Sequence, residues 1–304
     1  MRYEEFKEEL IREMRMYVLL HLDHPEKYKL EDAGKNYKNN REMDIICVRR
    51  EQDQIGLCIY PEKEYEEYRK GRTVQEIVKD WPGWRQECPE KYVQAVRQVE
   101  QGWSRTKDML MLRLIQMEQN QNFLQKVPWR KLDGTDLGIM YQMRIDTSGS
   151  IAVTNVLAKL WKVGEEELYQ AAWQNLQEED CIFSAGEVMQ GTAGVLMRES
   201  APSRAYDQSL CYMVYADRPF GTAAVLNLKV MEAAERFFGK RFFLFPLDTE
   251  RMILIHEMDS LKIKGTQMYL AERKEEDLEY REKSLSNSMY VWEDGKLSLF
   301  RAHR

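Results

Sequence analysis

The chain has 304 residues, a length typical of about two domains, and a formal net charge of −6. Hydrophobic residues make up 43% of it and charged residues 32%, a composition that excludes a disordered chain. The longest apolar stretches fall far short of the ~18 residues of a membrane-spanning helix. Neither half of the chain is basic, which argues against general nucleic-acid binding.

Residues 1–127 are predicted to form an N-terminal α+β domain that contains a helix, a hairpin and further helices. Apolar residues recur at helical spacing over residues 3–22, and the asparagine-containing stretch Glu31–Glu42 is predicted to be a loop. The strand-like runs Met43–Val48 and Gln54–Tyr60 then form a hairpin.

Two helical regions complete this domain. Thr73 is suited to cap a short apolar helix. The pattern is helical from Pro89 to about Leu124, and the segment 109–117 is so apolar on all sides that it predicts a buried helix. The 17 methionines are interpreted as gap fillers in the core, with a methionine-rich binding surface as the alternative.

Residues 128–304 are predicted to form a C-terminal α+β domain. Its expected strands are 137–145, 151–155, 209–215, 241–246, 251–256, 288–292 and 296–300. Its expected helices are 165–177, 226–238 and 259–283, and 181–207 is expected to be mostly loop. Because the strands come mostly in hairpin pairs with helices between them, the fold class is α+β with mainly antiparallel sheets and two subdomains. A strand–strand–helix unit also recurs at 43–81, 137–177 and 241–272, which suggests an internal repeat.

Cysteine usage indicates a reducing compartment. The five cysteines are Cys47, Cys58, Cys88, Cys181 and Cys211. Their number is odd and no C-x-x-C pair occurs, so reduced thiols are favoured over a zinc site or a disulfide framework. The N-terminus lacks the pattern of a secretory signal peptide, and a cytoplasmic location is therefore expected.

The common catalytic motifs are missing from the sequence. It contains neither the phosphate-binding G-x-x-x-x-G-K-[ST] loop nor the G-x-S-x-G nucleophile elbow. Gly221-Thr222-Ala223 precedes a predicted helix, where its amides could receive an anion or its small residues could serve close packing. His21 and His24 have the spacing of a metal-binding pair, with a solvated helix end as the favoured interpretation.

Acidic and polar residues at predicted strand ends are the remaining candidates. Asp133 and Asp136 flank a turn and could bind a divalent ion, although such turns also form for backbone reasons alone. In His256-Glu257-Met258-Asp259 the side chains could ligate a metal or supply a base, or could serve as caps and turn residues. The candidate binding residues are Asp217, Asp248, Thr249, Glu250 and His256.

Several spaced motifs together resemble a known family. They are Ile59-Tyr60 with Tyr65-x-x-Tyr68-x-x-Gly71, Leu112-x-Leu114-Ile115, Asn120-x-x-Phe123-Leu124-x-x-Val127-Pro128, Asp136-Leu137, Ile151-x-Val153-x-Asn155-x-Leu157, Trp161, Glu167-Leu168-Tyr169-x-x-Ala172-x-x-Asn175, Tyr212-Met213-Val214, Gly221-x-Ala223-Ala224 and Phe243-x-Phe245-Pro246. From about residue 40 to 300 the chain is similar to an uncharacterised family of Firmicutes proteins, frequent in gut Clostridia and known only as a domain of unknown function.

The resemblance implies a bacterial, intracellular protein and no particular activity. The chain departs from the family pattern at that pattern's most polar segments. It has Tyr215-Ala216-Asp217 where the family strand ends in Thr-Asn, and Leu247–Arg251 where the family has Ser-Ser-x-His-Glu. A catalytic site shared by the family is therefore not expected in this member.

The leading hypothesis is a non-catalytic cytoplasmic protein that binds a partner protein or a small ligand, with a role in regulation. It rests on the lack of strong catalytic motifs in a chain long enough to carry one. It assigns no catalytic residue, no metal and no cofactor. The alternative is an enzyme of unfamiliar type, a hydrolase or transferase, whose acidic strand-end site uses Asp217, Asp248, Glu250, His256 and Glu257.

Overall fold

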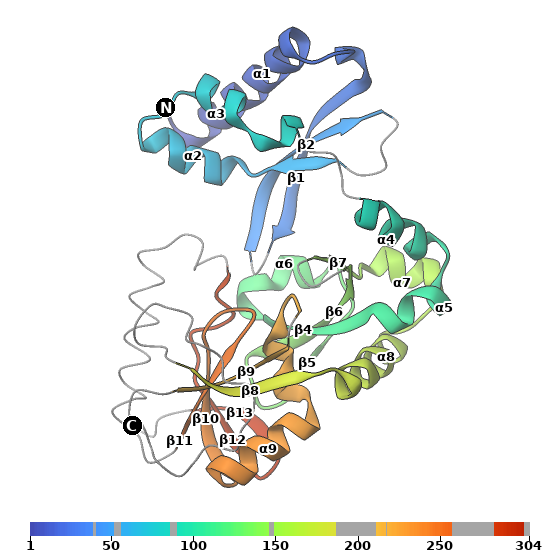
Figure 1. Ribbon diagram of the computed structural model, residues 1–304, viewed down its shortest axis with the longest axis vertical. Helices are drawn as coiled ribbons and strands as arrows, with labels where there is room; N and C mark the ends of the chain where they lie inside the picture. The colour runs from blue at the N-terminus through green and yellow to red at the C-terminus, as the bar shows by residue number, and fades with distance from the viewer. Residues whose placement is uncertain are drawn as a thin grey trace. The chain divides into compact units, whose positions relative to one another are not determined.

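The computed structural model describes residues 1–38, 41–51, 56–85, 90–145, 149–186, 211–216, 218–256 and 283–300. The chain forms two compact units, Met1–Glu100 (unit 1) and Gln101–Arg304 (unit 2) (Figure 1). The described strands form three antiparallel sheets with helices packed on them, which confirms the predicted α+β class. None of the described helices is both long and apolar enough to cross a membrane.

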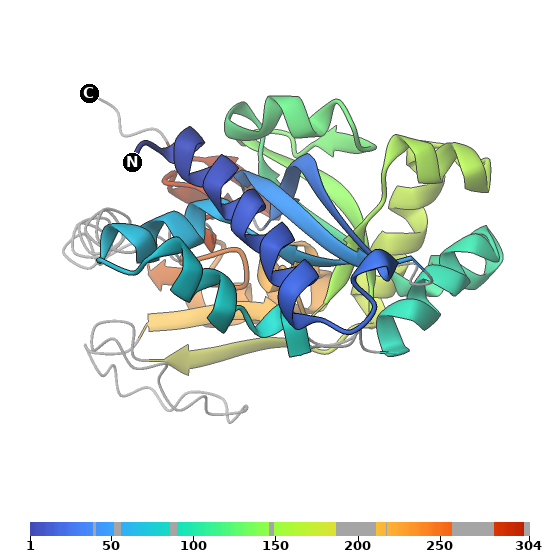
Figure 2. The same ribbon diagram turned by 90° about the horizontal axis from the view of Figure 1, so that it is seen from above.

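Unit 1 contains an antiparallel sheet with its first three α-helices packed on one face. Its elements are α1 (Tyr3–His21), η1 (Pro25–Lys27), β1 (Tyr28–Lys38), β2 (Arg41–Arg50), β3 (Leu57–Ile59), α2 (Pro61–Arg69), α3 (Val74–Asp80), η2 (Pro82–Arg85) and α4 (Glu90–Glu100). The strand order is β1-β2-β3, and α1 lies across the strands beside α3 (Figure 2). Phe6, Leu10 and Met14 of α1 pack on Ile46 of β2 and Ile77 of α3 to form the core.

The predictions for unit 1 hold except for β1. The segment 31–42, expected to be a loop, lies mostly in β1, which pairs with β2 along its whole length. Its residues are polar because β1 is an edge strand whose side chains are largely exposed. The predicted hairpin is confirmed by the pairing of β2 with β3. Thr73 caps α3, because its side chain accepts a hydrogen bond from the Glu76 amide.

Unit 2 contains the other two sheets. Its elements are α5 (Trp103–Thr106), η3 (Lys107–Met109), β4 (Leu110–Gln116), η4 (Glu118–Asn120), α6 (Gln121–Leu124), β5 (Trp129–Lys131), β6 (Leu137–Arg144), β7 (Ser150–Ala152), α7 (Asn155–Trp161), α8 (Glu165–Glu178), β8 (Cys181–Gly186), β9 (Cys211–Ala216), η5 (Gly221–Leu226), α9 (Leu228–Phe238), β10 (Arg241–Pro246), β11 (Met252–His256), β12 (Tyr290–Glu293) and β13 (Lys296–Leu299). One sheet has the order β4-β6-β5 with β7 also paired to β6, and the other has the order β13-β12-β10-β11-β9-β8.

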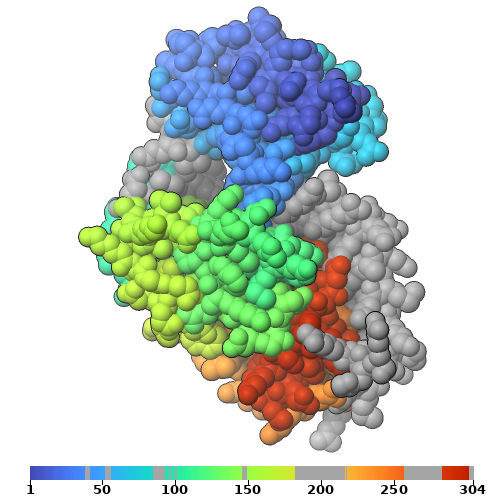
Figure 3. All heavy atoms as spheres, turned by 180° about the vertical axis from the view of Figure 1, so that it is seen from behind, coloured from blue at the N-terminus to red at the C-terminus, as the bar shows by residue number. Residues whose placement is uncertain are grey.

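Helices join the two sheets of unit 2. The short helix η5 packs against both β4 and β9, and therefore connects the smaller sheet to the larger one. The helix α8 packs against β4, and α9 packs against β8 and β10. In the space-filling view of Figure 3, the segments coloured green and yellow-green lie next to one another on one face of this unit.

The segment 109–117 is a strand, not the predicted buried helix. All seven residues of β4 are buried, and β4 pairs with β6 from Leu110 opposite Met143 to Gln116 opposite Leu137. A strand covered on both faces is apolar throughout, so its sequence lacks the alternation that separates a strand from a buried helix. The predicted boundary between residues 127 and 128 lies in the chain between the paired strands β4 and β6, and the chain divides into its two compact units between Glu100 and Gln101.

Most other predictions for unit 2 match the structure. The hairpins β10–β11 and β12–β13 pair as expected, and α9 ends at Gly239. Residues 181–186, expected to be loop, form β8. The helix expected at 259–283 lies almost entirely outside the described residues, and the suggested internal repeat therefore stays a prediction.

Candidate functional site

The predicted binding residues Asp248, Thr249 and Glu250 lie together in the turn between β10 and β11. The carboxylate of Asp248 accepts hydrogen bonds from the amides of Glu250 and Arg251 at 2.7 and 2.8 Å, and pairs with the Arg251 guanidinium at 2.6 Å. The carbonyl oxygen of Thr249 accepts a hydrogen bond from the Thr222 hydroxyl at 2.9 Å. These groups close and anchor their own turn.

His256 lies at the other end of the same hairpin. It is opposite Phe242 in the register, whereas the turn begins beyond the pair Pro246 and Met252. Four residues of a strand span about 14 Å, so the structure separates His256 from Asp248. The structure therefore does not bring these two predicted site residues together. The other two predicted residues, Asp217 and Glu257, lie outside the described residues.

The carboxyl of Glu250 lies partly buried beside the amide of Gly221. Burial raises its pKa above the ordinary value, an effect that the amide of Gly221 opposes and the charge of Asp248 reinforces. The Gly221 amide donates to Oε2 of Glu250 at 3.4 Å. A Cβ atom on Gly221 would lie 2.4 Å from the carbonyl oxygen of Ala216, so this glycine is needed for close packing. The structure thus favours packing over anion binding for Gly221-Thr222-Ala223.

The other proposed metal ligands have protein partners. Both carboxylate oxygens of Asp136 accept hydrogen bonds, from the Tyr290 hydroxyl at 2.6 Å and the Ser288 hydroxyl at 2.8 Å. His21 ends α1, and His24 lies beyond the helix beside Glu26. Across the described residues, no group of three or more His, Cys, Asp or Glu side chains could hold a metal ion.

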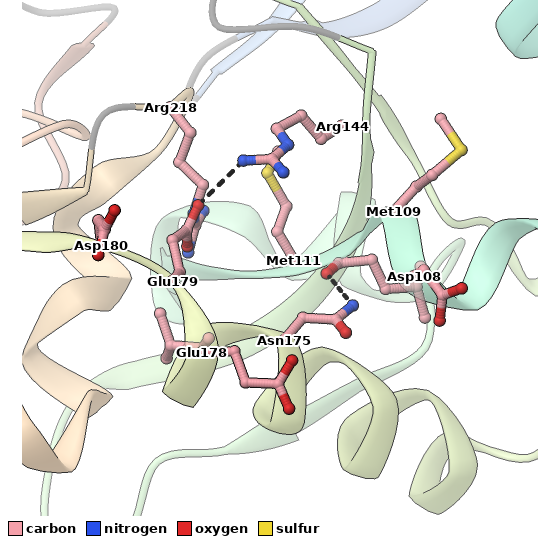
Figure 4. Close-up of a pocket in the computed structure, with 11 residues that line it drawn as sticks. Asp108, Met109, Met111, Arg144, Asn175, Glu178, Glu179, Asp180 and Arg218 are labelled. Atoms are coloured by element: carbon pink, nitrogen blue, oxygen red, sulfur yellow. Dashed lines mark hydrogen bonds and ion pairs between the residues drawn. The ribbon is translucent and has the colours of Figure 1, made fainter.

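A polar pocket of about 490 Å³ lies within unit 2, where η3, β4 and the C-terminal end of α8 come together (Figure 4). The end of β6 and the segment before η5 complete its wall. Its lining residues are Asp108, Met109, Leu110, Met111, Arg144, Asn175, Leu176, Glu178, Glu179, Asp180 and Arg218. The volume lies in the range of about 300–1,000 Å³ that small-molecule sites occupy.

Glu179 stands at the centre of the pocket's ion pairs. Arg218 donates to it through Nε at 2.6 Å and Arg144 through Nη1 at 3.2 Å, and Figure 4 shows both side chains converging on this carboxylate. The Arg218 side chain is only 1% exposed and also donates to the carbonyl oxygen of Leu112 at 3.2 Å, which fixes it between β4 and η5. The Arg144 side chain is 49% exposed, so this partner of Glu179 is half-exposed whereas Arg218 is buried.

Asn175 fixes the position of α8 against the rest of the wall. Its side-chain amide donates to the carbonyl oxygens of Lys107 and Leu110 at 2.9 and 2.8 Å. These two bonds satisfy carbonyl groups where η3 passes into β4, and they hold the last two turns of α8 beside them. This wall of the pocket is therefore held by hydrogen bonds to backbone carbonyl groups, so its shape is fixed before a ligand binds.

The electrostatic balance of the pocket is negative. Four carboxylates line it against two guanidinium groups, and both of the latter pair with Glu179. The remaining carboxylates, on Asp108, Glu178 and Asp180, are exposed at the rim. The C-terminal end of α8 adds the negative end of a helix dipole. This arrangement favours a positively charged group.

Cys181 follows the pocket residues Glu179 and Asp180 in the chain and is a poor nucleophile. Burial, together with the nearby charge of Glu179, raises the pKa of its thiol to about 11. The reactive form of cysteine is the thiolate, which is scarce at neutral pH when the pKa is this high. Covalent catalysis by this residue is therefore not favoured.

The pocket residues Arg144, Glu179 and Arg218 are not among the residues that the sequence predicts for a site. Glu179 and Arg218 are 39 positions apart, and their pairing depends on the packing of η5 against β4. One signal pointed towards this region: Arg113 is a charge inside the apolar run of β4. Its guanidinium lies over the Phe220 ring, 3.5 Å from the centroid, and the side chain is buried. A charged residue inside an apolar run indicates a buried polar network.

Fold and site together define an α+β protein with a preorganised, negatively charged pocket in its larger unit. The chain belongs to a family of unknown function (DUF5688), whose model matches residues 3–294 and thus nearly the whole chain. No curated protein and no solved structure matches the chain significantly.

Proposed function

We propose that this chain is a non-catalytic, cytoplasmic ligand-binding protein of a Firmicutes bacterium, and that the pocket around Glu179 takes a small organic cation. Occupancy of the pocket would be the signal in a regulatory role. The observation that carries the proposal is the cavity of about 490 Å³ whose lining holds twice as many carboxylates as guanidinium groups. A small ligand is favoured over a partner protein because the polar groups converge on a concave site.

The lining suits an amine with an aliphatic body. The rim carboxylates of Asp108, Glu178 and Asp180 are exposed and can each accept charge-assisted hydrogen bonds from an ammonium group. Met109 and Met111 supply flexible, polarisable contacts for the aliphatic part. The Arg144 guanidinium is already paired with Glu179.

The enzyme alternative has less support from the geometry. Its carboxylate Asp248 is committed to the amides and the guanidinium of its own turn, and His256 lies about 14 Å along the hairpin from that turn. Glu250 has a carboxyl whose pKa is raised by burial, a property that a general acid needs.

A matched set of three ligands tests the proposal: 1,4-diaminobutane, 1,4-butanediol and succinate have the same chain length and carry positive, zero and negative charge. The diamine is expected to raise the unfolding temperature, because a ligand at ten times its Kd adds about 1.4 kcal/mol, roughly 3 to 5 °C for a unit of this size. The diol and succinate are expected to have no effect. An equal response to all three, or none to the diamine, contradicts the proposal.

Variants of the lining residues test whether the diamine binds in this pocket. Glu178→Gln with Asp180→Asn removes two rim charges and is expected to weaken binding of the diamine about tenfold, and Met109→Trp is expected to abolish it by filling the cavity. Asp133→Asn is the matched control, because this exposed carboxylate is absent from the pocket lining and its loss leaves binding unchanged.

A further inference from the structure

Two of the cysteines of unit 1 lie on adjacent strands. Cys47 of β2 and Cys58 of β3 are direct partners in the antiparallel register. We propose that they are a modification site: a dithiol that a low-molecular-weight disulfide converts reversibly into a Cys47–Cys58 disulfide. The site lies in unit 1 and is independent of the ligand proposed for unit 2.

The register gives the two residues a Cα separation that a disulfide can span. Directly opposite residues of an antiparallel pair have Cα atoms about 5.5 or 4.5 Å apart, depending on whether the pair exchanges backbone hydrogen bonds. Disulfides span Cα separations of about 4.4–6.8 Å, so either kind of pair meets the requirement. The neighbouring pairs, Ile46 with Ile59 and Val48 with Leu57, show that the register continues on both sides.

Both side chains lie on the same face of the sheet and can be reached from solvent. Ile46 and Val48 belong to the core beneath α1, and side chains alternate along a strand, so Cys47 points to the opposite face. Directly opposite residues share a face, which places Cys58 there as well. Both cysteines are half-buried, and neither is sealed in the core.

Gly56 gives the Cys47 sulfur room to move. A Cβ atom on Gly56 would lie 2.2 Å from Sγ of Cys47, so this sulfur occupies the space above the glycine. Rotation about χ1 carries a cysteine sulfur from one staggered position to another without moving the backbone. The step needed for bond formation is therefore a side-chain rotation towards Cys58.

The chemistry is two successive thiol–disulfide exchanges. The thiolate of one cysteine attacks a sulfur of the small disulfide RSSR, forming a protein mixed disulfide and releasing one RS⁻. The thiolate of the other cysteine then attacks the protein sulfur of that mixed disulfide and releases the second RS⁻. Two protein thiols lose two electrons and two protons in total, and RSSR is reduced to two RSH.

The expected consequence is that oxidation links β3 covalently to β2. The bond would close a short loop between β2 and β3 and hold this three-residue strand, which leads directly into α2, against its neighbour. In a reducing cytoplasm the resting form is the dithiol, and disulfides formed there are typically transient and sensory. The pair would thus respond to a rise in oxidised thiols.

Cys181 provides an internal control. It lies opposite Ala216 in the pairing of β8 with β9, so the register gives it no cysteine partner. The pKa of its thiol is raised to about 11, which disfavours the thiolate needed for exchange. Cys181→Ser is therefore expected to leave the reaction of Cys47 and Cys58 unchanged.

The test is incubation of the full chain, reduced beforehand, with oxidised glutathione at about pH 8, followed by intact mass and peptide mapping. The expected result is a loss of about 2 Da, a single cross-linked peptide pair joining Cys47 to Cys58, and full reversal by dithiothreitol. Cys47→Ser and Cys58→Ser are each expected to stop at a mixed disulfide that adds about 305 Da.

Three results would overturn the proposal: no loss of mass in the wild-type chain, a mixed disulfide that persists, or a cross-link that involves Cys88, Cys181 or Cys211 in place of this pair. The mapping is made on the wild-type protein, so the test does not depend on the folding of a variant. Circular dichroism before and after oxidation shows whether the fold is retained.

Discussion

Asp136 and Glu179 are two carboxylates of unit 2 that each connect separate elements, and they differ in what surrounds them. Asp136, just before β6, accepts hydrogen bonds from the hydroxyls of Tyr290 and Ser288 and so ties the smaller sheet to β12. Glu179, just after α8, pairs with the guanidinium groups of Arg144 and Arg218. The first carboxylate is enclosed by neutral donors, and the second lines a pocket of about 490 Å³.

This difference in surroundings shows that Asp136 has a structural role, whereas Glu179 forms part of the pocket wall. Burial and the hydrogen bond to Asp136 raise the pKa of Tyr290, so this phenol remains a neutral donor at every physiological pH. The network around Asp136 is satisfied by the protein alone. Around Glu179 the ion pairs fix the inner wall, whereas the neighbouring carboxylates of Glu178 and Asp180 are exposed and available to a ligand.

The largest expected effect comes from Arg218→Ala. It removes the buried partner of Glu179 and a donor to the carbonyl oxygen of Leu112, and breaking a pair of this kind costs about 3 kcal/mol of the free energy of unfolding. Arg144→Ala, which removes a half-exposed partner of the same carboxylate, is expected to cost about 0.5 kcal/mol. Urea unfolding of both variants measures the difference, and equal losses would show that burial does not set the strength of these pairs.

A smaller loss is expected for Asp136→Asn. The amide offers one acceptor where the carboxylate offers two, so one hydroxyl from β12 or the segment before it loses its partner, at a cost of about 2 kcal/mol. Tyr290→Phe deletes one donor and keeps the ring, and about 1 kcal/mol is expected. Denaturant titration gives both values. A neutral Asp136→Asn would mean that this carboxylate does not hold the two sheets together.

A small effect of opposite sign is expected for Glu250→Gln. Burial raises the pKa of this carboxyl in the folded state above its ordinary value of 4.5, so the folded state binds the proton more tightly than the unfolded state does. The resulting stabilisation is complete below pH 4.5 and is lost as the pH rises through the folded-state pKa. The variant, which has no charge to bury, should be more stable than the wild type by about 0.5 kcal/mol at pH 7 and equal to it near pH 4. Thermal unfolding at the two pH values checks this, and a destabilised variant at pH 7 would contradict the assignment.

The contrast between α9 and β4 shows how far the sequence predicts the fold. For α9 the periodicity predicts a helix over 226–238, and this helix is confirmed, with the Asn227 side chain capping its start and Gly239 following its end. For β4 the sequence supplies only an apolar run, since the strand is buried on both faces, and the helical prediction is wrong. Local signals identify elements with one solvent-exposed face, and burial on both faces removes those signals.

The candidate site was less predictable for a related reason. The predicted site residues at strand ends rest on residue type alone. In the structure, the Asp248 carboxylate accepts hydrogen bonds from the amides of its own turn. Arg144, Glu179 and Arg218 meet only because β6, α8 and the segment before η5 pack together. No local sequence pattern predicts that these three side chains come together, because their contact depends on tertiary packing.

The most direct test of the central claim is an NMR titration of the full chain, labelled at its methionine methyl groups, with 1,4-diaminobutane. The protein has 17 methionines, of which Met109 and Met111 line the pocket and Met14 is buried in the core of unit 1. Saturable shifts of the Met109 and Met111 signals are expected, together with an unchanged Met14 signal and no response to 1,4-butanediol. Unshifted Met109 and Met111 signals at saturating diamine, or equal shifts with the diol, would contradict the claim.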